Sequence, residues 1–293
     1  MQKYTLKTPS RDNQFSVNYQ QELNPEQLEV VMSGDGPLLV IAGAGSGKTR
    51  TLTYRVARLI ESGVNPATIL LVTFTNKASK EMLHRVELLI SMNTRKLWGG
   101  TFHHIANRIL RSKAQLLDYD NNFTILDRED SKELINTCIA DLNINTKEKR
   151  FPQATIIQDV IGLSVNTQAT LENLISDRYP FFFDLTEEIQ RIALTYHKRK
   201  KQNNLMDFDD LLLNWLTLLT DHPEVREQYA QQFKHILVDE YQDTNRIQAD
   251  CIDLLARGHR NVMVVGDDSQ SIYSFRGANF TNIIDFPNRY PDA

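Results

Sequence analysis

The chain has 293 residues, of which 41% are hydrophobic and 24% are charged, a composition typical of a globular protein with roughly two domains. Its formal net charge of −4 argues against a protein that coats nucleic acid through bulk positive charge, but does not exclude a local basic groove. Two isolated cysteines, Cys138 and Cys251, exclude a zinc site built on cysteines and suggest a reducing compartment. With no apolar leader and no run near the roughly 18 apolar residues of a membrane span, the sequence predicts a cytoplasmic protein without membrane contact.

Residues 1–21 are polar, lack helical periodicity and are interpreted as a flexible or loosely docked extension. A helix is expected directly after them, because Asn24 is a good N-cap and Pro25 suits the first helical position. Gln27 lies inside this helix. It is either an ordinary surface residue or a reader of adenine, whose N6 and N7 a glutamine amide can bind together.

The segment that follows has the pattern of a phosphate-binding loop. An apolar run at 38–41 predicts a buried strand, small residues follow it, and a helical pattern opens at Lys48 and Thr49. In such loops backbone N–H groups surround the phosphates, the lysine reaches the β- and γ-oxygens, and the threonine hydroxyl ligates Mg²⁺. The general pattern expects glycine where this chain has Ala42, and the alternative is a glycine-rich turn with no ligand. The residues expected to contact the nucleotide phosphates are Gly43, Ala44, Gly45, Ser46, Gly47, Lys48 and Thr49.

Short apolar runs alternate with helical patterns along the rest of the chain, except in one long segment. Alternation of this kind predicts a parallel sheet with helices on both faces, an α/β fold in which ligands bind at the carboxyl ends of the strands. The further strands are expected at 69–72, 97–98, 235–238 and 261–265, and helices at 51–62 and 77–91. Residues 112–206 lack such strands and contain amphipathic helical patterns at 127–141 and 185–201, so they are interpreted as an all-helical insertion.

Polar and aromatic residues follow the second and third strands, at the same sheet edge as the glycine loop. The two phenylalanines among them are either core residues or stacking platforms for bases, the latter worth about 1–3 kcal/mol per base. The residues predicted to contact nucleic acid are Phe74, Thr75, Asn76, Thr101, Phe102 and His103. Within the insertion, the basic clusters 147–150 and 197–201 are either solvated helix faces or phosphate contacts.

Two acids end the predicted strand at 235–238. With the glycine loop, they suggest that Asp239 holds Mg²⁺ through water and that Glu240, beside the metal, polarises the attacking water; alone they could be a helix-capping pair. After the last strand, Gln270 is placed to sense the γ-phosphate. Beyond it lies an aromatic and basic cluster suited to single-stranded nucleic acid or to a phosphate, formed by Tyr273, Phe275 and Arg276.

Taken together, these motifs resemble those of superfamily 1 DNA helicases of the UvrD/Rep/PcrA family, from about residue 22 onward. The segments that carry the resemblance are LNPEQ, AGAGSGKTR, TFTNKAS, GTFHH, MDFDDLL, VDEYQDTN and VGDDSQSIYSFRGA. Two residues depart from the usual family pattern: Ser269 stands where an acid is common and Phe275 where tryptophan is common. The resemblance implies that Gln27 reads adenine, that Arg50 lies near the nucleotide and that Arg276 faces a phosphate. It further implies that Gln270 couples the γ-phosphate to DNA contacts and that Tyr273 and Phe275 meet bases.

The resemblance also implies a division of the chain and an activity. Residues 22–111 and 207–293 would form a discontinuous RecA-like P-loop lobe, with 112–206 inserted as a helical subdomain. Hydrolysis of ATP with Mg²⁺ would drive 3′→5′ movement on single-stranded DNA and opening of DNA junctions. The family's second RecA-like lobe, with motifs IV to VI, is expected beyond Ala293, so this part alone should hydrolyse ATP poorly. The alternative is an ATP-switched nucleic-acid-binding module that does not translocate; a P-loop kinase or GTPase is disfavoured, because no acceptor lid and no guanine-reading segment are evident.

Overall fold

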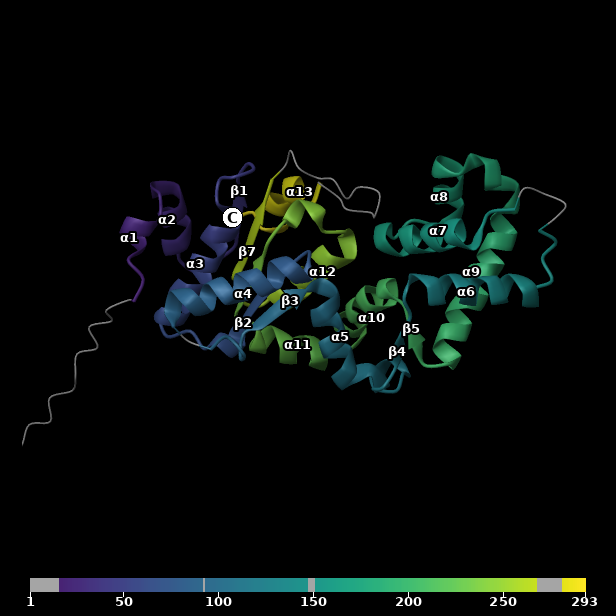
Figure 1. Cartoon of the computed structure of the whole chain (residues 1–293), viewed down its shortest axis with the longest axis horizontal. Coiled ribbons are helices and arrows are strands. Elements are labelled where there is room, and N and C mark those ends of the chain that lie inside the picture. The colour runs from purple at the N-terminus through teal and green to yellow at the C-terminus, as the bar shows by residue number, and fades with distance from the viewer. Residues whose placement is uncertain (1–15, 92, 147–150, 268–280) are drawn as a thin grey trace, which may run out of the picture.

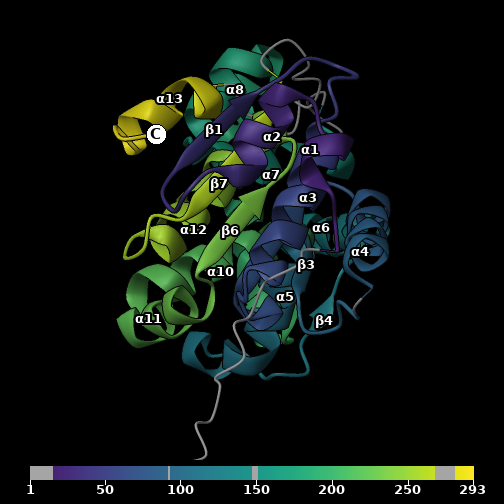
Figure 2. The same ribbon diagram turned by 90° about the vertical axis from the view of Figure 1, so that its left-hand side faces the viewer.

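The structure is a computed structural model that describes residues 16–91, 93–146, 151–267 and 281–293. A five-stranded sheet forms its centre, and every strand pairing in it is parallel. Its strands are β1 (Leu38–Ile41), β2 (Ile69–Thr73), β3 (Trp98–Thr101), β6 (His235–Val238) and β7 (Val262–Gly266), in the spatial order β1, β7, β6, β2, β3. The predicted parallel α/β sheet is therefore confirmed, and the carboxyl ends of all five strands meet at one edge (Figure 2).

Both faces of the sheet are buried. Successive strand residues point to opposite faces, and the residues that point to either face are apolar. In β2, Ile69 and Leu71 belong to one core, whereas Leu70 and Val72 belong to the core on the opposite face. The first core is covered by α3 (Lys48–Glu61) and α4 (Asn76–Ile90). The second is covered by α5 (Phe102–Lys113), α10 (Phe208–Asp221), α11 (Pro223–Gln232), α12 (Arg246–Ala256) and α13 (Thr281–Arg289), on the other side of the sheet in Figure 2.

The described part of the N-terminal segment packs on α3. A short helix, α1 (Tyr19–Glu22), precedes α2 (Pro25–Met32), which begins with the predicted Asn24 cap. Val17 and Tyr19 are buried, and the Tyr19 hydroxyl donates to Glu61 at 2.6 Å. Residues 16–21 are thus docked on the sheet-covering helices.

A group of helices extends from the sheet and carries its own apolar core (right-hand side of Figure 1). It consists of α6 (Arg128–Asp141), α7 (Ala154–Thr167), α8 (Leu171–Arg178), the 3₁₀ turn η3 (Pro180–Leu185) and α9 (Thr186–Gln202). Ile157, Ile192 and Tyr196 lie at the centre of this core. The segment is not entirely helical as predicted, since β4 (Thr124–Ile125) and β5 (Leu205–Met206) pair in parallel where the chain leaves and re-enters the sheet region. Two-residue strands are too short to produce an alternating pattern, which is why the sequence did not reveal them.

The remaining short elements are the 3₁₀ turns η1 (Pro66–Thr68), η2 (Ala114–Leu117) and η4 (Tyr241–Asp243). Among the described residues, no helix has the length and apolar character needed to cross a bilayer.

Candidate functional site

The glycine loop between β1 and α3 leaves the N-terminus of α3 open. Gly45 and Gly47 have φ of +76° and +87°, a region that side chains with a Cβ rarely adopt. Gly47 is the N-cap of α3, and no side chain caps the helix there. The first N–H groups of the helix therefore point into the loop, where together with the helix dipole they favour a phosphate.

Lys48 is buried, with 9% of its surface exposed, and its ammonium group is held by two oxygens. It donates to the Ala42 carbonyl at 3.0 Å and forms an ion pair with Asp267 at 3.2 Å. The contact at Ala42 uses only the backbone, and the Ala42 N–H continues the β1–β7 pairing to Gly266. Alanine in place of the usual glycine is therefore compatible with this loop. Asp267 was not singled out from the sequence, although its place just after β7 at the ligand-binding edge is the signal that could have identified it.

Asp239 comes directly after β6, beside the loop. The Thr49 hydroxyl donates to one of its carboxylate oxygens at 3.4 Å, and the other oxygen is buried with no hydrogen-bond partner in the described part of the chain. Burial, and then the neighbouring Glu240 carboxylate, raise the pKa of Asp239 to about 6. A hydroxyl beside an unsatisfied carboxylate oxygen fits Mg²⁺. No cluster of three or more His, Cys, Asp or Glu suited to a metal occurs among the described residues, so phosphate and water oxygens would have to complete the coordination, as is usual for Mg²⁺.

Glu240 has a left-handed backbone, with φ of +51°, which is uncommon for a residue other than glycine. Its carboxylate accepts a hydrogen bond from the Gln242 side chain at 2.7 Å. The same Gln242 amide accepts from the Asp267 N–H at 3.0 Å, so it joins the turn after β6 to the end of β7. Gln242 is a further site residue that sequence reasoning missed.

Gln27 lies against the glycine loop. Its side-chain amide donates to the Ser46 carbonyl at 2.9 Å and accepts from the Asn24 N–H at 3.3 Å. Arg50 lies on the same side, where it donates to the Glu22 carbonyl at 2.8 Å and covers the Tyr54 ring at 4.8 Å. Both residues therefore border the loop, and their contacts with adenine and nucleotide stay predictions.

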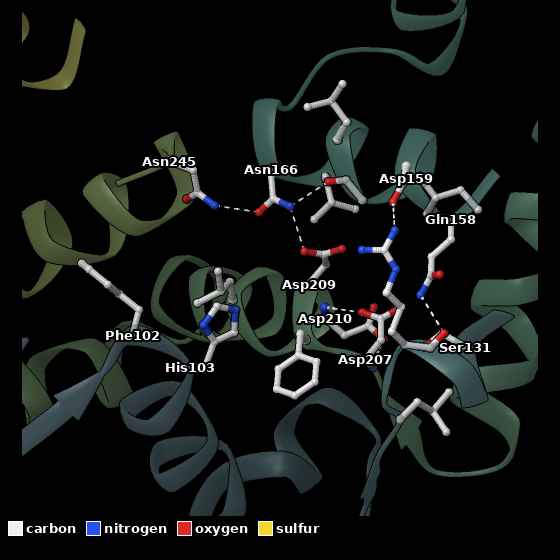
Figure 3. Close-up of a pocket in the computed structure, with 18 of the residues that line it drawn as sticks. Phe102, His103, Ser131, Gln158, Asp159, Asn166, Asp207, Asp209, Asp210 and Asn245 are labelled. Carbon is white, nitrogen blue, oxygen red and sulfur yellow. Dashed lines mark hydrogen bonds and ion pairs between the residues drawn. The ribbon is translucent and has the colours of Figure 1, made fainter. Parts of the chain in front are cut away.

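A cleft of about 940 Å³ separates the carboxyl edge of β2 and β3 from the group of helices α6 to α9. The predicted nucleic-acid residues from 74–76 and 101–103 and the start of α10 line the side of the sheet, and α6, α7 and α9 line the other side (Figure 3). Phe208 also borders the cleft, is 52% exposed, and has its ring 5.8 Å from that of His103. Sequence reasoning missed Phe208; its position as an aromatic beside the Asp207 helix cap was the available signal.

Comparison with known proteins agrees with these features. A model of the UvrD/REP helicase N-terminal domain matches residues 23–291. The chain belongs to this family. It is 42% identical over 272 residues to the ATP-dependent DNA helicase PcrA of Staphylococcus epidermidis, and 40% identical over 274 residues to that of Staphylococcus aureus. In each case the match covers 92% of this chain and 36% of the relative, so the chain spans about a third of the length of these relatives.

In this UvrD/REP family chain, some of the residues that were predicted to contact nucleic acid are buried, and others are accessible from the cleft. Phe102 is 2% exposed and packs in the core with α10 and α12, so its prediction as a base-stacking residue is wrong and the core alternative holds. The hydroxyl of the buried Thr101 caps α5 by accepting from the His104 N–H at 3.2 Å. Phe74 is only partly buried, and Asn76 is exposed at the start of α4, so both remain accessible from the cleft.

The basic cluster 197–201 is not a single solvated face. Lys200 is 1% exposed, and its ammonium group lies 2.5 Å from Asp207 and 2.6 Å from Asp210. Neither of the proposed roles, solvated surface or phosphate contact, applies to this lysine. Burial, and then the Lys200 charge, lower the pKa of His197 to about 4, so this imidazole is neutral near pH 7.

The other predicted residues lie outside the described part of the structure. These are Gln270, Tyr273, Phe275 and Arg276, together with the basic cluster 147–150. Their roles stay predictions.

Proposed function

We propose that this chain is the ATP- and DNA-binding part of a 3′→5′ single-stranded DNA translocase that opens DNA junctions. The observation that carries the proposal is the convergence of the loop on the acid after β6, with the Thr49 hydroxyl 3.4 Å from the buried Asp239 carboxylate. Membership of the UvrD/REP family supports it, and the relatives' name, ATP-dependent DNA helicase, mentions both ATP and DNA.

Each residue of the site has a role in this proposal. Thr49 and Asp239 hold Mg²⁺, which when bound neutralises charge on the β- and γ-phosphates. Lys48 leaves Asp267 to contact those phosphates, since its ammonium group already lies at the open end of α3. Glu240 orients the attacking water and accepts its proton, and Gln242 fixes the orientation of the Glu240 carboxylate.

The cleft supplies the nucleic-acid path. Phe74 and Phe208 present aromatic surface on which bases stack, and Asn76 and His103 provide hydrogen-bonding groups beside them. In this arrangement residues 22–111 and 207–293 form the nucleotide-binding lobe, and 112–206 form a subdomain that closes over the strand. A second RecA-like lobe supplies an arginine from across the nucleotide, and such an arginine accelerates phosphoryl transfer by about 10³–10⁵.

The test measures binding of a fluorescent ATP analogue with Mg²⁺, and ATP hydrolysis with and without single-stranded DNA. Lys48→Ala should abolish nucleotide binding, whereas Glu240→Gln should bind Mg-ATP and fail to hydrolyse it. Lys234→Ala, on an exposed residue at the opposite edge of the sheet, and Glu133→Gln, on an exposed residue of α6, are the matched controls. Hydrolysis should be slow in this chain alone and rise when the second lobe is supplied.

Two outcomes decide against parts of the proposal. Wild-type turnover by Glu240→Gln would remove Glu240 as the base. Binding of both ATP and DNA without DNA-stimulated turnover, even with the second lobe present, would favour the nucleotide-switched binding module over the translocase.

A further inference from the structure

Three polar side chains that line the cleft, from three helices, form a continuous chain of hydrogen bonds (Figure 3). Asn245, the N-cap of α12, donates from its side-chain amide to the Asn166 oxygen at 2.6 Å. Asn166, near the C-terminus of α7, donates in turn to the Asp209 carboxylate at 2.8 Å. Asp209 lies in the first turn of α10, so the three residues, here called the Asn166 bridge, join α7 to two helices that cover the sheet.

The geometry of the Asn166 bridge requires an asparagine at its centre. The oxygen of the Asn166 amide accepts from Asn245, while its nitrogen donates both to Asp209 and to the Gly162 carbonyl at 2.8 Å. Gly162 also sets the distance between the helices, because a Cβ at this position would lie 2.6 Å from the second carboxylate oxygen of Asp209. An aspartate in place of Asn166 would bring its carboxylate against that of Asp209. An alanine would remove the bonds to both Asp209 and Asn245.

At its other end, the Asn166 bridge joins the turn that carries Glu240. The Asp243 N–H donates to the Glu240 carbonyl at 2.9 Å, and the Thr244 N–H donates to the Tyr241 carbonyl at 3.2 Å. Thr244 is 1% exposed, and Asn282 of α13 donates to its carbonyl at 2.9 Å. Glu240 and Asn245 are therefore the two ends of one hydrogen-bonded turn, most of which is buried.

We propose that Asn166 is a positioning residue that couples nucleotide binding to the position of the helical group α6 to α9. The inference rests on the proposed function, since it assumes that ATP binds beside Glu240 and DNA in the cleft that α7 lines. Nucleotide binding shifts the turn from Glu240 to Asn245, the shift moves α7 through Asn166, and α7 changes its grip on the strand. Because coupling between two ligands is reciprocal, DNA in the cleft alters nucleotide affinity by the same factor.

The experiment measures this coupling factor directly. The dissociation constant for a fluorescent oligodeoxythymidine is measured on the full chain, without nucleotide and with a saturating non-hydrolysable ATP analogue and Mg²⁺. For wild type we expect the two constants to differ by roughly 5- to 150-fold, the usual range for coupled sites. In Asn166→Ala the ratio should fall to about 1, while nucleotide affinity without DNA stays within about twofold of wild type. The matched control is Thr167→Ala, whose hydroxyl bonds to the Leu163 carbonyl of its own helix.

A charge swap separates coupling from general damage. Asn166→Asp should lose coupling, because its carboxylate cannot donate to that of Asp209. It should also bind DNA more weakly than Asn166→Ala, because it adds negative charge to the wall of the cleft. Adding Asp209→Asn should restore most of the coupling, since the new amide at 209 can donate to the carboxylate at 166. Rescue by the swap is not expected if the Asn166 side chain merely fills space.

The outcomes distinguish this inference from the proposed function. The role of Asn166 is overturned if Asn166→Ala keeps the wild-type ratio of the two DNA dissociation constants. It is also overturned if Asn166→Ala and Asn166→Asp both lose that ratio and the double variant with Asp209→Asn does not recover it. If wild type binds both ligands without coupling, the inference fails and the two binding sites stand. If wild type binds neither ligand, the proposed function fails together with the inference.

Discussion

Lys200 offers the sharpest test of how the helical group is attached to the sheet lobe. Its ammonium group, 1% exposed, lies between the carboxylates of Asp207 and Asp210, the cap and first turn of α10. The Tyr196 hydroxyl completes the cluster by donating to Asp207 at 2.8 Å. Burial, and then the Asp207 charge, raise the pKa of Asp210 to about 6. The lysine is thus the buried cation that faces both acids.

Lys200→Met keeps an apolar side chain of similar shape and removes the ammonium group, with its charge and its hydrogen bond to Asp207. Loss of one partner of a buried ion pair costs about 3–5 kcal/mol, which is a large share of the roughly 5–15 kcal/mol that stabilise a domain. The equilibrium between folded and unfolded protein should therefore shift by two to four orders of magnitude. Lys198→Met, on the exposed face of the same helix, removes the same charge and should change stability by less than about 1 kcal/mol.

The variant should also respond to pH in a defined direction. The Lys200 charge holds the pKa of Asp207 below its usual value, whereas the pKa of Asp210 is raised. Without the lysine, the pKa of each carboxyl in the folded protein rises, while in the unfolded chain it stays near the usual value of about 3.9. The folded variant then binds more protons than the unfolded one, so its deficit relative to wild type should shrink as the pH falls from about 8 to 5.

Urea unfolding followed by tryptophan fluorescence measures both effects, because Trp215 is fully buried in α10. If Lys200→Met loses no more stability than Lys198→Met, the buried charge cluster does not stabilise the fold. If the deficit is large but equal at both pH values, its cause is lost packing and not the uncompensated negative charge of the two buried acids.

Three further predictions concern the loop and the cleft. Asp239→Asn should stabilise the metal-free and nucleotide-free chain by up to about 3 kcal/mol at pH 7.5. The pKa of Asp239 is about 6 in the folded protein and 3.8 in the unfolded chain. The stability that protonated Asp239 contributes is therefore full below pH 3.8 and is lost as the pH rises through 6. An equal gain at pH 4, seen by thermal unfolding, would contradict this. Gly47→Ala should cost at least about 1–2 kcal/mol in urea unfolding, because φ is +87° and a Cβ there would lie 2.6 Å from the Gln27 side-chain nitrogen. Gly34→Ala, where a Cβ meets open space, should cost less. Phe74→Ala should weaken binding of single-stranded DNA in a fluorescence titration with little change in stability, and Phe102→Ala should cost about 3–5 kcal/mol; a stability loss at Phe74 as large as at Phe102 would place Phe74 in the core.

Much of the nucleotide site follows from local sequence patterns. The glycine loop, its lysine and threonine, and the two acids after β6 are each encoded within a few residues, because backbone conformation and strand periodicity are local properties. The parallel order of strand and helix then places all strand ends at one edge, which is why the loop and Asp239 were predicted to converge, and the structure brings Thr49 and Asp239 within 3.4 Å.

Tertiary structure decided which partner each buried polar group has. Phe74 and Phe102 follow neighbouring strands in similar sequence settings, yet only Phe102 is enclosed, because α10 packs over its helix. Lys200 lies in a basic run that resembles a solvated surface, and only the approach of the α10 cap makes it a buried ion-pair partner. Asn166 and Asn245 are 79 positions apart, and no local pattern links them. Burial and pairing depend on which elements meet in space, so the sequence alone predicted the loop and the acid beside it, and packing determined which other polar side chains are buried and which partners they have.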